Sequence, residues 1–182
     1  MPTLERTMFR EYDIRGRAVD GELDEHAVYH IARGFAATLK ETGGTEAVVG
    51  RDTRESSPRL RDAAVRGLTE SGVSVIDIGI CTTPMSHWAR YHFNVPGLCM
   101  ITASHNPAEW NGMKLGLTRE GTLLATEIAE LYERVVREEY VEGTGTVREE
   151  EIREAYYTDV LSRVTIPRAF KLLINTGNGT VG

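Results

Sequence analysis

"GLCMITASHNPAEWNGMKLGL", residues 97–117, contains an apolar run, a polar stretch and a second apolar run, and this order decides the fold. The first run, 97–102, is continuously apolar up to its last residue, which is typical of a strand buried on both faces of a sheet. Asn111-Gly112 predicts a tight return of the chain into the second run, 113–117, which we expect to be another strand. The stretch therefore predicts two core strands joined by a polar loop.

Outward from this stretch, helical and extended patterns alternate along the chain. Val28, Ile31, Phe35 and Leu39 recur at three- and four-residue steps, which is the spacing of one buried helix face. Strands separated by helices form β-α-β units, in which helices cover both faces of the sheet. The sequence therefore predicts an α/β fold, a three-layer α/β/α domain with a mixed, largely parallel sheet. We expect helices over 24–40, 58–71, 85–93 and 126–136, and strands over 46–50, 73–79, 97–102 and 113–117.

The character of the chain changes near residue 140. A charged, Gly-containing stretch follows, and it predicts a connection and then a helix over about 149–162. "FKLLINTGNGTVG", residues 170–182, reads as a strand followed by a Gly-rich turn. We therefore expect one domain over 1–140, and a linker, a helix and the first strand of an incomplete second α/β domain over 141–182. Such an exposed strand edge would favour self-association.

The charge balance argues against nucleic acid as a partner. The net charge is −6, whereas binding to a phosphate backbone relies on an excess of Lys and Arg. No stretch is long and apolar enough to span a membrane, and the N-terminus lacks the apolar core of a secretory signal. Cys81 and Cys99 form no close pair in the sequence, and Cys99 lies in an apolar run, where we expect a reduced, buried thiol. These features predict a soluble, cytoplasmic protein.

Ser104 is the first candidate for chemistry, since it follows the buried strand directly. A serine in a surface turn is the simpler interpretation of its position alone. Its neighbours His105, Asn106 and Lys114, with Arg51 and Arg54 on the loop after 46–50, favour a group that binds phosphate. A serine hydrolase would be expected to show G-x-S-x-G at a strand-to-helix turn, and the sequence lacks that motif.

A second candidate stretch is "FREYDIRG", residues 9–16. Its charged residues are those of a solvated edge, but Phe9, Tyr12 and Ile14 give it apolar anchors. A loop held in place in this way can present Arg15 to a phosphate.

The motifs FREYDIRG, GRDTRESS, TTP, TASHNPAEWNGMK and INTGNGTVG occur in the order seen in the α-D-phosphohexomutases. The chain resembles the N-terminal, catalytic-serine domain of a phosphomannomutase/phosphoglucomutase over essentially its whole length. The resemblance implies interconversion of hexose 1-phosphate and hexose 6-phosphate through a bound 1,6-bisphosphate, by intramolecular phosphoryl transfer. It also implies small phosphosugars as partners and glucose 1,6-bisphosphate, or an equivalent, as the activator.

The resemblance also assigns roles to residues. Ser104 would be the phosphoserine, and a Mg²⁺ ion would be held by its phosphate. His105 and Lys114 would act in proton transfer or hold the transferring group, with His105 favoured as the base. Asn106 would shape the serine loop, while Tyr12 and Arg15 would line the cleft and Arg15 would pair with the phosphate. Arg51 would bind phosphate from the neighbouring loop, with Asp52 in a supporting role.

The resemblance leaves several alternatives open. Complete family members have four domains around one cleft, and the Mg²⁺ ligands lie in an aspartate-rich loop that this sequence lacks. We therefore expect the chain to be inactive alone. The main alternative is a non-catalytic phosphosugar-binding or complementing module that works with a partner chain. Within the family, mannose and glucose remain open as substrates, and phosphoglucosamine mutase is a further alternative. An unrelated serine hydrolase ranks last.

Overall fold

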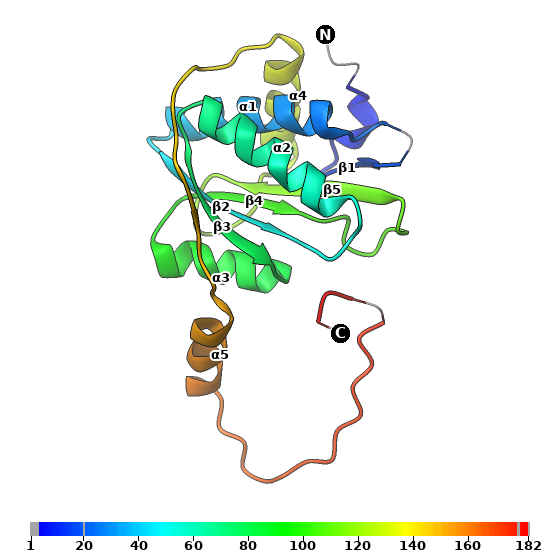
Figure 1. The fold of residues 1–182 in the computed structure, drawn as a ribbon, viewed down its shortest axis with the longest axis vertical. Helices are drawn as coiled ribbons and strands as arrows, with labels where there is room; N and C mark the ends of the chain where they lie inside the picture. Colours follow the sequence, from blue (N-terminus) through cyan, green and yellow to red (C-terminus); the bar gives the residue numbers. More distant parts are fainter. Residues whose placement is uncertain (1–3, 20, 178, 182) are drawn as a thin grey trace.

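The computed structural model describes residues 4–19, 21–177 and 179–181, and it is built around a six-stranded sheet with helices on both faces (Figure 1). The strands lie in the order β1-β5-β4-β2-β3-β6. They are β1 (Ile14–Arg17), β2 (Glu46–Arg51), β3 (Ser74–Ile80), β4 (Gly97–Ile101), β5 (Trp110–Gly116) and β6 (Val147–Glu149). The helices are a short 3-10 helix η1 (Arg6–Met8), α1 (Glu25–Glu41), α2 (Ser57–Glu70), α3 (Thr83–Phe93), α4 (Ala125–Val136) and α5 (Arg153–Ser162).

The sheet is mixed and largely parallel, which confirms the prediction. β4, β2, β3 and β6 run parallel to one another, whereas β5 runs antiparallel to β4 and β1 antiparallel to β5. The link between β4 and β5 is therefore a hairpin-like loop rather than a helical crossover. This loop lies at the carboxyl end of β4, beside the carboxyl end of β2.

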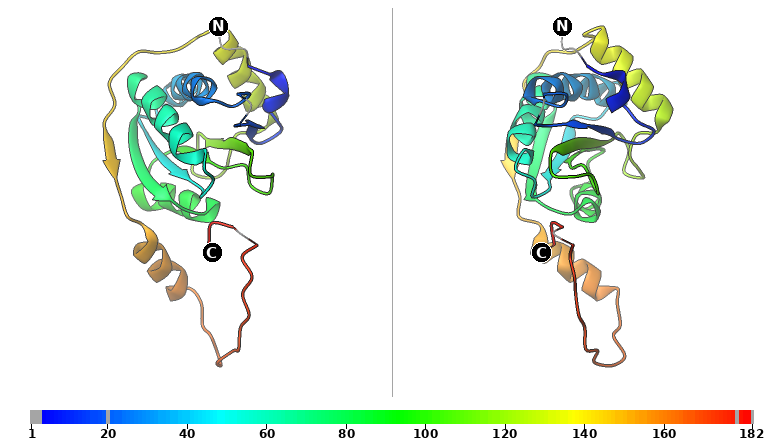
Figure 2. Two further views of the ribbon diagram at one scale, coloured as in Figure 1. Left: turned by 45° about the vertical axis from the view of Figure 1, so that its right-hand side comes forward. Right: turned by 90° about the vertical axis from the view of Figure 1, so that its right-hand side faces the viewer.

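Two apolar cores separate three layers. One core lies between the sheet and α1, α2 and α4, and the other lies between the sheet and α3. Figures 1 and 2 show this arrangement, with α3 on the opposite face of the sheet from α1 and α2. The helices α1 and α2 pack closely because Gly67 has no side chain: a Cβ there would lie 2.6 Å from the carbonyl oxygen of Tyr29. The predicted three-layer α/β/α class is confirmed.

The helix ends follow the local sequence. Asp24 caps α1, since its side chain accepts a hydrogen bond from the backbone N–H of Ala27 over 2.8 Å. Pro58 lies in the first turn of α2, where the missing N–H costs no intrahelical bond. Asn94 ends α3 in the left-handed conformation, with φ at 57°.

The structure corrects the prediction for the N-terminal segment, which we expected to be irregular. Residues 14–17 form edge strand β1, paired with β5. Asn111-Gly112 is not a turn but part of β5. A Cβ on Gly112 would lie 2.4 Å from the carbonyl oxygen of Ile14 and 2.8 Å from that of Thr102, so glycine is required there by close backbone packing.

The structure also differs from the prediction beyond residue 140. Residues 147–149 form strand β6 on the edge of the same sheet, and α5 begins at Arg153 rather than near 149. The prediction of a strand in 170–182 is wrong for the residues described there, because they form neither helix nor strand. A strand needs a neighbour for its backbone hydrogen bonds, and these residues have no strand partner within the described part of the chain. Asn178 and Gly182 of this segment lie outside the described residues.

Segment 141–182 nevertheless contacts the main body of the protein. Ile152 is buried in the core beneath α3, and the indole N–H of Trp88 donates to Asp159 of α5 over 2.8 Å. Cys99 is a buried free thiol, as expected, and so is Cys81. Within the described ranges, no helix combines the length and the apolar character that crossing a membrane requires.

Candidate active site

The serine loop, residues 102–109 between β4 and β5, presents Ser104 to solvent. Ser104 is exposed and has φ at 57°, a left-handed conformation that costs a non-glycine residue energy. Its backbone N–H donates to the hydroxyl of Thr102 over 3.1 Å, and that of Asn106 donates to the carbonyl of Ala103 over 3.1 Å. The Oγ of Ser104 lies 3.4 Å from Nδ1 of His105. The loop thus displays a hydroxyl beside an imidazole.

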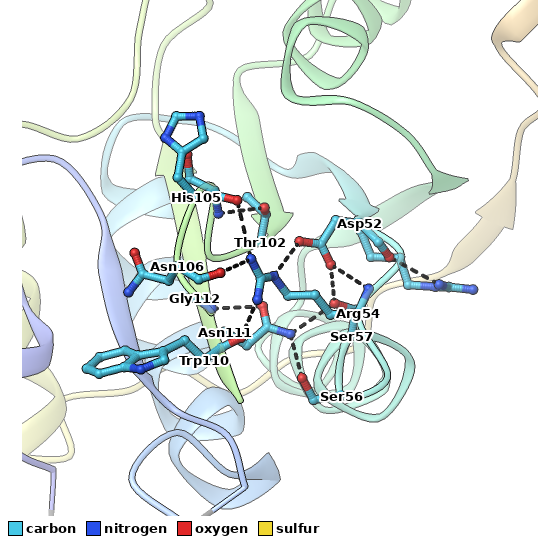
Figure 3. Close-up of polar contacts among 12 residues, drawn as sticks. Asp52, Arg54, Ser56, Ser57, Thr102, His105, Asn106, Trp110, Asn111 and Gly112 are labelled. Carbon is cyan, nitrogen blue, oxygen red and sulfur yellow. Dashed lines mark hydrogen bonds and ion pairs between the residues drawn. The ribbon is translucent and has the colours of Figure 1, made fainter. Parts of the chain in front are cut away.

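Arg54, which follows β2, binds the backbone of this loop. Figure 3 shows its guanidinium between Asp52 on one side and the backbone of the serine loop on the other. It donates to the carbonyl of Asn106 over 2.7 Å and to that of Ser104 over 3.3 Å. It also donates to the carbonyls of Pro107 and Trp110, over 2.6 and 3.1 Å. One side chain therefore binds four carbonyls along the loop and the start of β5.

A chain of hydrogen bonds anchors Arg54 in turn. The carboxylate of Asp52 accepts from its Nε over 3.1 Å and from its backbone N–H over 3.1 Å. The Asp52 carboxylate also accepts from the hydroxyl of Ser57 over 2.5 Å, and that hydroxyl accepts from the amide of Asn111 over 2.9 Å. Asn111 belongs to β5, so the chain of contacts closes on the same strand that Arg54 reaches through Trp110. Ser57 and Asn111 are fully buried, which shields the network from water.

A second cluster lies on the other side of the serine loop, around Asp13. One oxygen of Asp13 accepts from Nε and Nη2 of Arg15, over 3.0 and 2.7 Å, and from Nζ of Lys114 over 2.8 Å. Its other oxygen is buried without a partner among the described residues. Burial raises the pKa of Asp13, but the hydrogen bonds from Arg15 and Lys114 outweigh it and hold the pKa below its ordinary value.

This cluster is joined to the serine loop by Arg15, whose Nη1 donates to the side-chain oxygen of Asn106 over 2.8 Å. Lys114 lies 5.2 Å from the ring centroid of Tyr12, a cation–π distance. The structure therefore brings together six of the residues singled out in the sequence. They are Tyr12, Arg15, Ser104, His105, Asn106 and Lys114.

A pocket of about 790 Å³ lies against the exposed face of the serine loop. Residues 52–55 and Ser104, His105, Asn106 and Ala108 line it, together with Thr176, Gly177, Gly179 and Thr180 of the C-terminal segment. Arg51 does not line it. The side chain of Arg51 donates to the carbonyl of Asp52 over 3.4 Å, and its Nε is buried without a partner in the described structure. Its phosphate-binding role therefore stays a prediction.

Asp13 and Arg54 are the residues whose importance the sequence did not reveal. Arg54 was one donor among several in GRDTRESS, and Asp13 was one charge within FREYDIRG. For both, the available signal was their position: each lies beside a strand end that the topology brings to the serine loop.

The charges near the serine are mixed. The cations Arg15, Arg54 and Lys114 pair with the carboxylates of Asp13 and Asp52, and Glu55 also lines the pocket. A complete metal site is not present in this chain as described, since those residues include no cluster of three or more His, Cys, Asp or Glu side chains. The residues therefore fit a phosphate better than a bare divalent cation.

Comparison with known proteins finds a matching family model and several relatives. Residues 6–142 match the family model for phosphoglucomutase/phosphomannomutase, alpha/beta/alpha domain I. The whole chain aligns with 40% of a phosphoglucomutase from Neisseria gonorrhoeae at 38% identity. It also aligns with 39% of a phosphomannomutase/phosphoglucomutase from Pseudomonas aeruginosa at 33% identity. A crystal structure of a phosphoglucomutase/phosphomannomutase family protein from Burkholderia thailandensis superposes with a TM-score of 0.92 at 31% identity, covering 99% of this chain and 41% of that one. The chain thus spans about 40% of the length of the relatives it matches.

Proposed function

Because the chain belongs to the phosphoglucomutase/phosphomannomutase family, we propose that Ser104 is its phosphoryl-carrying residue, in the interconversion of hexose 1-phosphate and hexose 6-phosphate. The family's enzymes are named as mutases of glucose and mannose phosphates, and both names occur among the relatives. Mannose and glucose phosphates are therefore the proposed substrates.

The observation that carries the proposal is the contact between Ser104 and His105 on an exposed loop. In the phosphorylated protein, a sugar hydroxyl attacks the phosphorus and the bond from phosphorus to Ser104 Oγ breaks. The sugar hydroxyl gives its proton to a base, for which we favour His105, and Ser104 Oγ takes up one proton as it leaves, so that protons balance; Nδ1 of His105 lies 3.4 Å from that oxygen. In the return step, the other phosphate of the bisphosphate goes back to Ser104 by the same path in reverse. Lys114 is the second candidate for the proton acceptor.

The surrounding cations contribute charge and position rather than bonds to the transferred group. Phosphoryl transfer depends chiefly on positioning and on neutralising the charge of the equatorial oxygens. Arg15 and Lys114 share one carboxylate oxygen of Asp13, so together they keep a positive charge close to the serine loop. Tyr12 lies beside Lys114 and is half exposed, which suits a residue lining the substrate cleft.

The Mg²⁺ ion and glucose 1,6-bisphosphate belong to the proposal through the resemblance alone. A phosphate on Ser104 would give the ion one oxygen ligand, and a bound ion would neutralise charge on the transferring group. The described residues offer it no further cluster of ligands, so no step above depends on it.

The proposal is tested by looking for phosphoserine at Ser104. The protein is produced from the complete reading frame that contains these residues, incubated with glucose 1,6-bisphosphate and Mg²⁺, digested and analysed by mass spectrometry. We expect phosphate on the peptide containing Ser104, and none in Ser104→Ala. Phosphate-free Ser104 in a folded protein would contradict the proposal.

A coupled assay then separates the alternatives. Mannose 1-phosphate, glucose 1-phosphate and glucosamine 1-phosphate are each offered to the 182-residue chain, first alone and then with a second chain. We expect no turnover by the 182-residue chain alone. A complementing module would gain turnover only after a second chain with an aspartate-rich loop is added. Labelling of Ser104 by a fluorophosphonate would instead favour a serine hydrolase.

A further inference from the structure

Most hydrogen bonds of the Arg54 side chain go to the serine loop and the start of β5 rather than to its own segment. Its side chain is 15% exposed and donates five hydrogen bonds, one to Asp52 and four to carbonyls of 104–110. A guanidinium has five N–H donors in a fixed plane, and this geometry suits several carbonyls gathered on one side. The contacts thus fix the direction of the loop's peptide groups as well as its position.

The direction of those carbonyls determines where the loop's N–H groups point. The described chain has no cis peptide bonds, and a trans peptide holds its N–H antiparallel to its carbonyl. The carbonyls of Ser104 and Pro107 are directed to Arg54, so the N–H groups of His105 and Ala108 are directed away from it. The peptide between Asn106 and Pro107 has no N–H to direct.

These two N–H groups are free to bind a ligand. Neither His105 nor Ala108 donates a backbone hydrogen bond within the part of the chain that the structure describes. Both residues line the 790 Å³ pocket, as does Ser104. Unpaired backbone N–H groups on one side of a turn suit an anionic ligand.

We propose that Arg54 is a positioning residue for a phosphate subsite formed by the backbone N–H groups of His105 and Ala108. By drawing the loop's carbonyls to one side, Arg54 turns these N–H groups and the left-handed Ser104 toward the pocket. The ligand is a phosphate group, either the phosphate on Ser104 or that of a sugar. The inference rests on the proposed function for its place in the reaction, but phosphate binding tests it independently.

The first test is a titration of the ¹⁵N-labelled 182-residue chain with inorganic phosphate, followed by NMR. In the unaltered chain we expect the amide signals of His105 and Ala108 to shift together with one dissociation constant. Because Arg54→Ala removes four charge-assisted hydrogen bonds to the carbonyls of 104–110, we expect it to weaken phosphate binding at those amides by at least about tenfold. Arg54→Lys should be intermediate, since an ammonium cannot reach four carbonyls at once.

The matched control is Arg59→Lys. Arg59 lies on α2, forms an ion pair with Glu25 and donates to the carbonyl of Ala18 over 2.6 Å, but it does not touch the serine loop. The substitution Arg59→Lys should leave the phosphate titration unchanged. Unshifted signals of the β-sheet amides and a thermal unfolding curve for each variant show that it is folded.

Either of two results would overturn the proposal. In the first, phosphate shifts neither the His105 nor the Ala108 amide signal of the unaltered chain. In the second, phosphate shifts both signals in folded Arg54→Ala as strongly as in the unaltered chain. Failure of the proposed function looks different: the amides would respond to phosphate, yet Ser104 would never acquire it from glucose 1,6-bisphosphate. Where Ser104 is phosphorylated, Arg54→Lys should lower the maximal rate of phosphorylation about tenfold or more while KM for the bisphosphate changes less. A merely structural role would instead lower the folded fraction.

Discussion

Replacing Asp13 with asparagine should destabilise the protein far more than the loss of one surface charge. Asp13 is 2% exposed, and the side chains of its partners Arg15 and Lys114 are 12% and 14% exposed. Removing one member of a buried ion pair leaves uncompensated charge and costs about 3–5 kcal/mol. Asparagine keeps one oxygen that can accept a hydrogen bond, so we expect a loss of about 3 kcal/mol, near the lower limit.

The measurement is urea unfolding at neutral pH, followed by circular dichroism. In a thermal melt of a chain of this size, a loss of about 3 kcal/mol would instead appear as a fall of roughly 6–12 °C in the midpoint. Glu133→Gln is the control, because Glu133 pairs with Arg137 on the surface of α4 with both side chains more than half exposed. It should cost no more than about 0.5 kcal/mol.

The pH dependence of the same comparison checks the cause. The pKa of Asp13 is lowered in the folded state, so its stabilising effect is complete above the ordinary carboxyl pKa and is lost as the pH falls through the lowered value. The difference between the two proteins should therefore narrow below about pH 4. A loss below about 1 kcal/mol at neutral pH, or a difference that stays constant with pH, would refute the reasoning.

Three other substitutions and one solution property should respond as follows. Gly112→Ala should prevent β1 from pairing with β5, because its Cβ would meet the carbonyl oxygen of Ile14 at 2.4 Å; weaker amide protection of β1 in hydrogen exchange would show this. Ser104→Gly should stabilise the chain by about 1 kcal/mol by removing the left-handed strain, while abolishing phosphorylation, and an unchanged unfolding midpoint would contradict the strain argument. Burial, and then the charge of His26, lowers the pKa of His30, so stability should fall as the pH drops from 7 through that lowered value, and His30→Gln should flatten the dependence seen in urea unfolding. The exposed apolar residues Phe170, Leu172, Leu173 and Ile174 should cause concentration-dependent self-association, and light scattering from a clean monomer at high concentration would rule this out.

The sequence predicted the elements that have strong internal periodicity. The helices α1, α2, α3 and α4 and the central strands β2 to β5 lie within a few residues of their expected ranges. The strands it missed are β1 and β6, four and three residues long at opposite edges of the sheet. All three residues of Val147–Glu149 are exposed, so no apolar alternation marks the segment as a strand. The prediction of a strand in 170–182 is wrong for the opposite reason. Apolar residues mark a segment that could pair with a neighbouring strand, but they do not supply that strand.

The site shows a similar limit. Charged side chains such as Arg15 and Lys114, which both pair with Asp13, were identifiable as candidates from residue type and position. The role of Arg54 was not, because its partners are mainly backbone carbonyls, which every residue has. Which carbonyls face inward depends on the loop's conformation, and that conformation depends on contacts between residues about fifty positions apart. Only the folded arrangement reveals them.

The antiparallel course of β5 has a consequence for how such a site can change over evolutionary time. In doubly wound folds, phosphate commonly sits at a helix N-terminus, where the helix dipole persists whatever the side chains are. Here the serine loop leads into a strand, so the loop is not itself the start of a helix. The cations that contact the loop or its neighbours are individual side chains, and in our proposal even the backbone donors depend on one arginine. Point substitutions can therefore adjust affinity for phosphate in small steps without rebuilding the scaffold, and one substitution at the wrong place can remove it.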